Sequence, residues 1–142
     1  MITATHTVDI ARPAQVVFDF VRDQRNEPKW HTDVLEVDPQ EPLELGSTVT
    51  WTVKFMGTNQ YVIEVTALDA PRSIRIETRD GPTKPTLTHR FESDDGATRY
   101  TRTVSIPEEG MLRIVGPIMK AIGAADRRNA TFAENLKALL EG

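Results

Sequence analysis

The chain of 142 residues contains no cysteine. This absence excludes disulfides, thiolate nucleophiles and the cysteine ligands of most structural zinc sites. Histidine is also scarce, and His6, His31 and His89 lie in separate segments without the paired spacing of a metal-binding motif. We therefore expect no metal site, no cofactor and no redox chemistry in the chain itself.

Long apolar runs and excess positive charge are also missing. No segment approaches the roughly 20 apolar residues that span a bilayer, and the first residues show no basic segment followed by an apolar one. The formal net charge of −4 opposes binding to phosphate backbones or anionic lipid. The sequence thus predicts a cytoplasmic protein that neither inserts into a membrane nor binds nucleic acid.

Signatures of nucleotide binding and covalent catalysis are absent as well. The chain has no glycine-rich phosphate loop and no GxSxG motif. Its serines, Ser47, Ser73, Ser93 and Ser105, fall at predicted turns, strand ends or outward positions, where no catalytic triad would converge. Because 39% of the residues are hydrophobic and 27% are charged, a composition typical of globular proteins, we expect one domain over residues 1–142.

What is present is a period-two alternation of apolar and polar residues, which predicts antiparallel strands. The alternation is clearest where Val49, Trp51, Val53 and Phe55 share one face. Similar patterns predict further strands over residues 2–10, 34–37, 61–67, 74–76, 87–91 and 100–106. The sequence therefore predicts a sheet of about seven strands.

Two short helices are expected between the first strand and the second. Pro13 suits the first turn of one helix, and the second is predicted near Trp30. The side of the first helix that should face the core comprises Val16, Val17, Phe20 and Val21.

The last third of the chain changes to helical spacing, which predicts one long helix from Met111 to Leu140. Gly116 and Pro117 interrupt this pattern, so the helix either begins at Pro117 or is kinked there. A curved sheet closed over the helix would leave a space walled mainly by apolar side chains. The apolar stripe comprises Met111, Val115, Ile118, Ile122, Ala125, Phe132, Leu136 and Leu140.

Local motifs agree with this order of elements. The segment VDIARPAQVVFDFVRD at 8–23, followed by Trp30 and His31, resembles the opening of the Bet v 1-like (START/SRPBCC) superfamily. Residues 46–49 are similar to the start of its third strand, and residues 110–118 and 135–141 to the closing helix of its polyketide cyclase/dehydrase-like branch. The resemblance implies an α+β helix-grip fold, in which a curved antiparallel sheet wraps a long C-terminal helix around an apolar cavity.

Four polar residues on apolar faces are candidates for contact with a ligand. His6 and His89 could transfer protons, or they could be buried histidines with structural hydrogen bonds. Arg102 could bind a carboxylate or enolate oxygen, pair with an internal acid such as Asp126, or be turned outward by a bulge. Asn129 could donate to a ligand or to the sheet backbone.

Aromatic and aliphatic residues complete the predicted ligand site. Trp30 should either line the mouth of the cavity or cap the core, and the charges at Arg127 and Arg128 are expected to be solvated. The predicted apolar lining comprises Trp51, Phe55, Tyr61, Phe91, Tyr100, Ile118, Ile122 and Phe132, with polar anchors at Arg102, His89, His6 and Asn129.

Two functions are favoured at this point over a third, a domain that docks to a protein partner, for which the outward residues, mostly Thr, Glu and Arg, offer little support. The first is binding of a small hydrophobic or aromatic molecule by a carrier, sensor or storage protein. The second is a metal-free polyketide cyclase, dehydratase or aromatase in which His89, Arg102 or His6 acts on the substrate. Whether the protein is an enzyme stays undecided, and both a monomer and a homodimer are compatible with the sequence.

Overall fold

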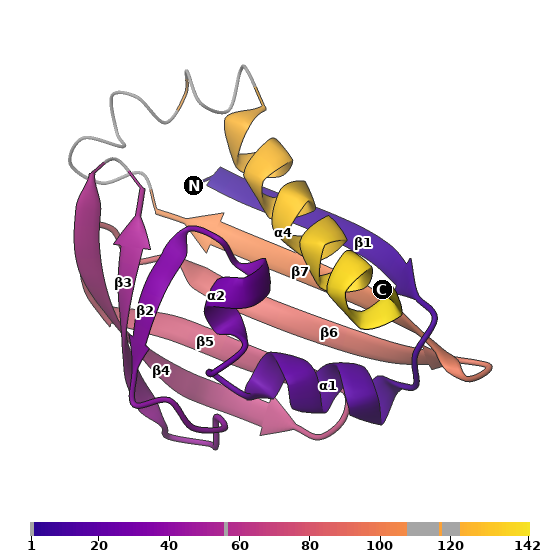
Figure 1. The fold of residues 1–142 in the computed structure, drawn as a ribbon. Helices are drawn as coiled ribbons and strands as arrows, with labels where there is room; N and C mark the ends of the chain where they lie inside the picture. The colour runs from indigo at the N-terminus through magenta and orange to yellow at the C-terminus, as the bar shows by residue number, and fades with distance from the viewer. Residues whose placement is uncertain (1, 56, 108–116, 118–122) are drawn as a thin grey trace.

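The computed structural model describes residues 2–55, 57–107, 117 and 123–142. Seven antiparallel strands form one curved sheet in the order β1-β7-β6-β5-β4-β3-β2 (Figure 1). This confirms the predicted sheet. The strands are β1 (Ile2–Ile10), β2 (Val34–Asp38), β3 (Thr48–Lys54), β4 (Thr58–Asp69), β5 (Ser73–Asp80), β6 (Thr86–Asp94) and β7 (Ala97–Ile106).

The alternation of side chains fixes how the strands pair. In β1, residues such as Ile2 and Ile10 are buried, whereas the threonines between them face solvent. The hydroxyl of Thr7 lies 2.9 Å from that of Thr101 on the outer face of β7. Asp95 and Gly96 join β6 to β7 with positive φ angles of 53° and 87°, as a two-residue hairpin turn requires. A slip of one residue would turn every apolar side chain to solvent.

Strand β4 departs from simple alternation. The pairing of β4 with β5 shifts between Val65 and Ala67, because a β-bulge inserts an extra residue there. Ala67 is consequently exposed and Leu68 packs against the core. The alternation predicted over residues 61–67 therefore does not extend to Ala67.

Two short helices follow β1, as predicted: α1 (Ala14–Arg22) and α2 (Glu27–Trp30). The buried face of α1 differs from the prediction, because Phe18 is fully buried and Val16 is 44% exposed. Ala14, Val17, Phe18 and Val21 form this face, at steps of three, one and three residues that keep them on one side of the helix. Phe18 meets Phe91 of β6 edge to face, with ring centroids 5.4 Å apart.

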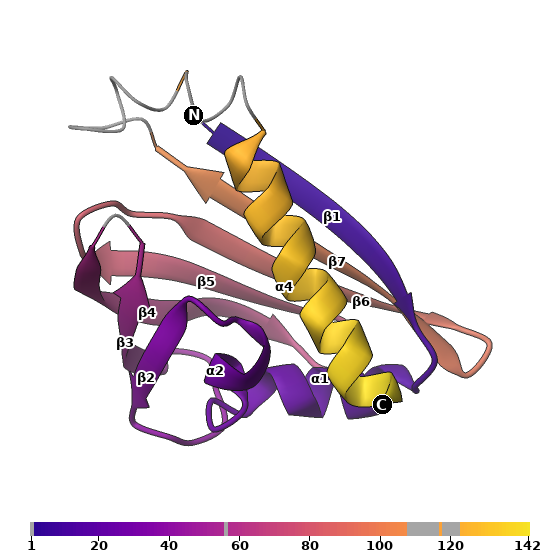
Figure 2. The ribbon, with the colours of Figure 1, turned by 45° about the horizontal axis from the view of Figure 1, so that its top comes forward.

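The C-terminal helix α4 (Ala124–Glu141) lies along β1 and β7 on the concave side of the sheet, the side that also carries α1 and α2 (Figures 1 and 2). Phe132, Ala133 and Leu136 are buried there. The end of α4 is tied down where Arg12 Nε donates to the carbonyl of Leu140 at 2.8 Å. The expectations for Ile118 and Ile122 concern residues outside the described part of the chain, and the residues on both sides of Pro117, which would show a helix start or kink there, also lie outside it.

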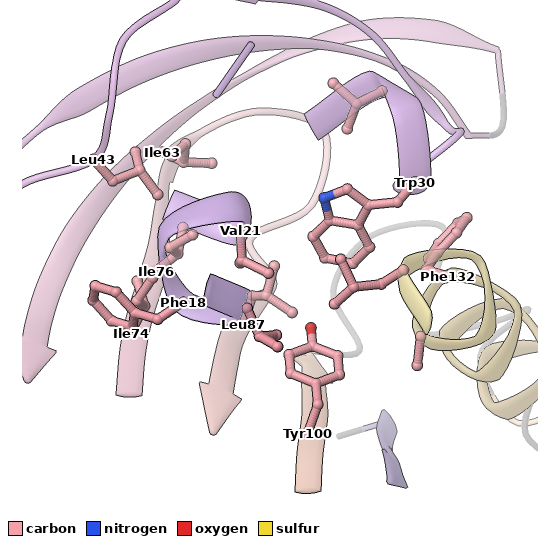
Figure 3. Close-up of a cluster of buried hydrophobic side chains, with 14 of the residues drawn as sticks. Phe18, Val21, Trp30, Leu43, Ile63, Ile74, Ile76, Leu87, Tyr100 and Phe132 are labelled. Atoms are coloured by element: carbon pink, nitrogen blue, oxygen red, sulfur yellow. The ribbon is translucent and has the colours of Figure 1, made fainter. Parts of the chain in front are cut away.

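The core fills the space between α1, α2 and the sheet. Trp30 is fully buried within it, which agrees with a cap on the core rather than a wet position at the mouth. Figure 3 shows the hydroxyl of Tyr100 directed toward Trp30, with Phe132 of α4 nearby. The rings of Trp30 and Tyr100 are perpendicular at 6.4 Å between centroids.

Candidate functional site

A cavity of about 130 Å³ lies between the sheet and α4. Strands β1 and β3 to β7 provide most of its walls, and the residues just after α2 provide another part. Its lining is mainly aliphatic and aromatic, with a few polar side chains. The lining residues are Ile2, Ala4, His31, Asp33, Trp51, Val53, Phe55, Tyr61, Ile63, Ile76, Thr78, Thr83, Pro85, Leu87, Arg102, Val104, Ile106, Ala125, Arg128, Asn129 and Phe132.

The predicted site residues divide into two groups. Trp51, Phe55, Tyr61, Arg102, Asn129 and Phe132 line the cavity. His89, Phe91, Tyr100 and His6 are not part of its described lining, while Ile118 and Ile122 lie outside the described residues.

Strand register places the three strongest polar candidates in one row. Arg102 on β7 pairs with His6 on β1 and with His89 on β6. The three side chains nevertheless have different surroundings. His6 is half-buried at the edge strand, where its Nε2 lies 3.3 Å from Glu134 Oε1 on α4.

His89 belongs to the core rather than to the cavity wall. Its Nδ1 lies 2.7 Å from the hydroxyl of Tyr100, and the two rings stack. Burial lowers the pKa of His89 well below its ordinary value, and the charge of Arg102 lowers it further. Burial raises the pKa of Tyr100. Both side chains are therefore neutral at pH 7 and act as a structural pair.

Arg102 is the most unusual residue of the cavity wall. Only 2% of it is exposed, and its guanidinium lies over the rings of Phe132 and Trp30 at 5.2 and 5.8 Å from their centroids. Nη1 donates to Asn129 Oδ1 at 2.6 Å. Within the described part of the chain, Nε has no hydrogen-bond partner. A buried cation with a free donor is a feature that an added acceptor would stabilise.

Asn129 fixes the position of Arg102. Its Nδ2 donates to the backbone carbonyl of Arg102 at 2.8 Å, while its Oδ1 accepts from the guanidinium of the same residue. The predicted bond from Asn129 to the sheet backbone is thus present. Asp126 is exposed, and no ion pair joins it to Arg102 among the described residues.

The partner of Arg102 is instead His31, whose Nε2 lies 3.4 Å from Nη2. A guanidinium only donates, so Nε2 must accept and the ring proton must sit on Nδ1. That nitrogen lies 2.8 Å from Glu27 Oε2, to which it donates. Burial lowers the pKa of His31, and Arg102 lowers it further. The result is a neutral imidazole between a buried carboxylate and a buried cation.

Two further residues extend this chain of contacts. Gln24 Nε2 lies 3.4 Å from Glu27 Oε1, and Gln24 Oε1 accepts from the indole of Trp51 at 2.8 Å. The His31 ring is held by Trp51 on one side and by Phe132, whose centroid is 4.6 Å away. We call Glu27, His31, Arg102 and Asn129 the polar wall, of which His31, Arg102 and Asn129 line the cavity and Glu27 is bonded to His31 without lining it.

Sequence reasoning identified Arg102 and Asn129 but missed Glu27 and His31. The signal available was their spacing of four residues, which places both side chains on one face of a helical turn. It was obscured because residues 24–33 carry no clear periodicity and because His31 has no apolar alternation around it.

A second charged contact lies at the cavity. Arg128 of α4 forms an ion pair with Asp33, and its guanidinium lies 5.3 Å from the centroid of Phe55. All three residues line the cavity. The prediction that Arg128 is simply solvated was therefore incomplete, because this side chain connects α4 to the segment after α2 and to the end of β3.

Tyr61 depends on a glycine for its place in the cavity wall. A Cβ atom at Gly81 would lie 2.6 Å from Tyr61 Cδ2, and Gly81 has a φ of 152°. We expect Gly81→Ala to lower the free energy of unfolding by about 1–3 kcal/mol through overpacking, as measured by urea denaturation. Gly46→Ala is the control, because Gly46 also has a positive φ but nothing within 4 Å. Equal losses for both variants would show that the contact with Tyr61 contributes nothing.

Metal-binding clusters and membrane-spanning helices are both absent from the described residues. Among them, no three His, Cys, Asp or Glu side chains form a group able to hold a metal ion. No helix in this part of the chain is long and apolar enough to cross a membrane.

Comparison with solved structures supports the fold. The protein TTHA0849 from Thermus thermophilus is 14% identical, with a TM-score of 0.80 over 98% of this chain and 97% of that chain. A START superfamily protein from Mycobacterium smegmatis is 16% identical, with a TM-score of 0.73 over 98% and 97% of the two chains. The Zhui aromatase/cyclase from a Streptomyces species is 18% identical, with a TM-score of 0.70 over 97% and 95%. At these identities the likeness concerns the fold alone.

Comparison of sequences gives the family. No curated protein matches the chain. Residues 1–141, however, match the family described as "Polyketide cyclase / dehydrase and lipid transport". The chain therefore belongs to this family, and it has the helix-grip fold that the sequence predicted.

Proposed function

We propose that this chain is a single ligand-binding domain that holds a small hydrophobic molecule, about the size of one aromatic ring, in the cavity between the sheet and α4. The observation that carries the proposal is the cavity itself, which is mainly apolar and about 130 Å³ in volume. An engineered protein cavity of about 150 Å³ lined by apolar side chains stays dry and binds benzene. A space of this size and lining favours a single ring over a long acyl chain.

The aromatic residues of the wall support the same proposal. Trp51, Tyr61 and Phe132 come from β3, β4 and α4 and all line the cavity. Aromatic rings pack against one another edge to face or offset, with a gain beyond the area that they bury. A ligand with an aromatic ring would therefore be preferred over an aliphatic one of equal size.

The alternative, a metal-free cyclase, dehydratase or aromatase, has less support. A proton-transfer group must reach its substrate, and His89 is engaged with Tyr100 in the core. A polyketide chain would also need more room than a single ring. Of the histidines, His31 is the one in the described cavity lining, and its Nε2 is engaged with Arg102.

Binding of toluene tests the proposal. We expect toluene to bind the purified protein with one site, detected by chemical-shift changes of the methyl groups of Ile63 and Val104, which line the cavity. Native mass spectrometry of the protein as purified would ask in parallel whether a small apolar molecule accompanies the chain.

A pair of variants on α4 provides the control. Ala125 and Ala130 are both half-buried, but Ala125 lines the cavity and Ala130 does not. Ala125→Phe should fill the space and weaken toluene binding at least about tenfold, whereas Ala130→Phe should leave it unchanged. The proposal fails if toluene does not bind, or if it binds both variants equally well.

A further inference from the structure

We propose that the polar wall binds the carboxylate of a small aromatic acid and that His31 takes up one proton when the acid binds. This inference rests on the proposed function, because it places the ring of the acid in the apolar part of the cavity. It assigns a chemical class to the ligand and a role to His31 that the apolar cavity alone does not require.

The geometry of Arg102 is the first step. A guanidinium carries five N–H donors in a rigid fork that suits a carboxylate. The guanidinium lies over the rings of Phe132 and Trp30, and its N–H groups are the atoms that can form hydrogen bonds. One edge is engaged with Asn129, and the contact with His31 is long at 3.4 Å. Arg102 thus has donor capacity left in a cavity whose described lining is otherwise mostly apolar.

The balance of charge is the second step. In the free protein, the positive charge of Arg102 is compensated by Glu27, with neutral His31 between them. Adding a carboxylate would leave a net negative charge in a buried site, which is unfavourable. If His31 gains a proton, the two cations Arg102 and His31 balance Glu27 and the ligand. Binding with uptake of one proton therefore keeps the polar wall neutral.

The direction of the hydrogen bonds is the third step. The lone pair of His31 Nε2 faces Arg102, so unprotonated Nε2 would repel a carboxylate oxygen placed between the two residues. A proton on Nε2 turns this atom into a donor, while Nδ1 continues to donate to Glu27. The new N–H bond forms at Nε2 with a proton from solvent, and no bond of the ligand breaks.

Other charges near His31 do not remove this requirement. Asp33 lies on the same side of the cavity and is paired with Arg128 of α4, so these two charges offset each other. His89 on β6 is neutral and bonded to Tyr100. From α2 and β7, the groups facing His31 are Glu27 and Arg102. Protonation of His31 is therefore the nearest available response to an added anion.

The test compares benzoate with toluene, which share a ring and differ in the carboxylate. At pH 7, we expect benzoate to bind at least about tenfold more tightly than toluene, because charge-assisted hydrogen bonds are added. Calorimetry in phosphate and in Tris, which differ in ionisation enthalpy, should report uptake of nearly one proton per benzoate and none per toluene.

Variants locate the proton. His31→Gln should abolish proton uptake, because the glutamine amide donates without being protonated, whereas His89→Gln should retain it. Arg102→Lys should weaken benzoate at least about tenfold, and by a clearly larger factor than it weakens toluene, since the fork is lost.

Several results would overturn the inference. If benzoate binds no better than toluene, the polar wall does not bind a carboxylate, and the proposed function stays intact. Proton uptake that persists in His31→Gln would mean that the ligand binds as the neutral acid. If Arg128→Gln loses benzoate binding while His31→Gln retains it, the carboxylate binds at Arg128 and not at the polar wall. If neither probe binds, the proposed function fails and this inference fails with it.

Discussion

Replacing Glu27 with glutamine is expected to lower the free energy of unfolding by about 3 kcal/mol, because breaking a buried pair leaves an uncompensated charge inside the protein. Glu27 is only 1% exposed, and it compensates Arg102 through His31. Glutamine keeps the size of the side chain and an oxygen that can accept from His31. The loss would therefore report the charge rather than the packing, and urea denaturation at pH 7.5 would measure it.

A double-mutant cycle separates the charge effect from other consequences. In the Arg102→Met background there is no cation to compensate, so Glu27→Gln should cost about 1 kcal/mol or less. Glu134→Gln serves as the exposed control, since Glu134 also contacts a histidine, His6, but at the surface. It should change stability little. Equal costs of Glu27→Gln in both backgrounds would show that Glu27 does not act through Arg102.

The order of strands and helices could be predicted because apolar residues repeat every second position in a half-buried strand and every three to four positions in a half-buried helix. Alternation in β1 and β3 gave strands whose register follows from burying one face. The bulge between Val65 and Ala67 could not be predicted in this way. It depends on the pairing of two strands, which no local pattern of β4 contains.

The candidate site shows the same limit at the level of single side chains. The alternation of residues along β6 and β7 correctly predicted that His89 and Arg102 face inward. Alternation gives the direction of a side chain, however, and not which other side chains surround it. His89 contacts Tyr100 in the core, whereas Arg102, its neighbour across the β6–β7 pair, reaches the cavity. The difference arises from which residues of α2 and α4 lie above each strand, and the sequence does not specify those distances.

The sequence could predict that Arg102 has a hydrogen-bond partner, but it could not identify that partner. An inward arginine requires an acceptor, and this requirement predicted that a partner exists. Asp126 was one choice by helical spacing, yet the partners are Asn129 on the same helix and His31 from another element. Glu27 compensates the charge without touching it. A relay through a neutral imidazole has no signature in the sequence beyond the four-residue spacing of Glu27 and His31.

The stability of the protein is expected to fall steeply as the pH is lowered below about 6.5. Burial and the charge of Arg102 lower the pKa of His31 and, more strongly, that of His89. The unfolded chain, whose histidines titrate near 6.5, then binds more protons than the folded chain. Stability is fully present above pH 6.5 and is lost below it, by up to about 1.4 kcal/mol per pH unit for each histidine. Urea denaturation between pH 5 and 7.5 would show this loss, with a slope of at most about 2.7 kcal/mol per unit from the two histidines.

Single substitutions assign this slope to the two residues. His89→Gln and His31→Gln should each reduce the slope in this range, and His89→Gln should reduce it more, because the pKa of His89 is lowered more strongly. His89→Gln tests the stacked pair with Tyr100, and His31→Gln tests the polar wall. Because benzoate binding is proposed to protonate His31, saturating benzoate should also remove the contribution of His31 while leaving that of His89. A slope that neither substitution changes would mean that carboxylates, and not these histidines, cause the loss of stability in acid.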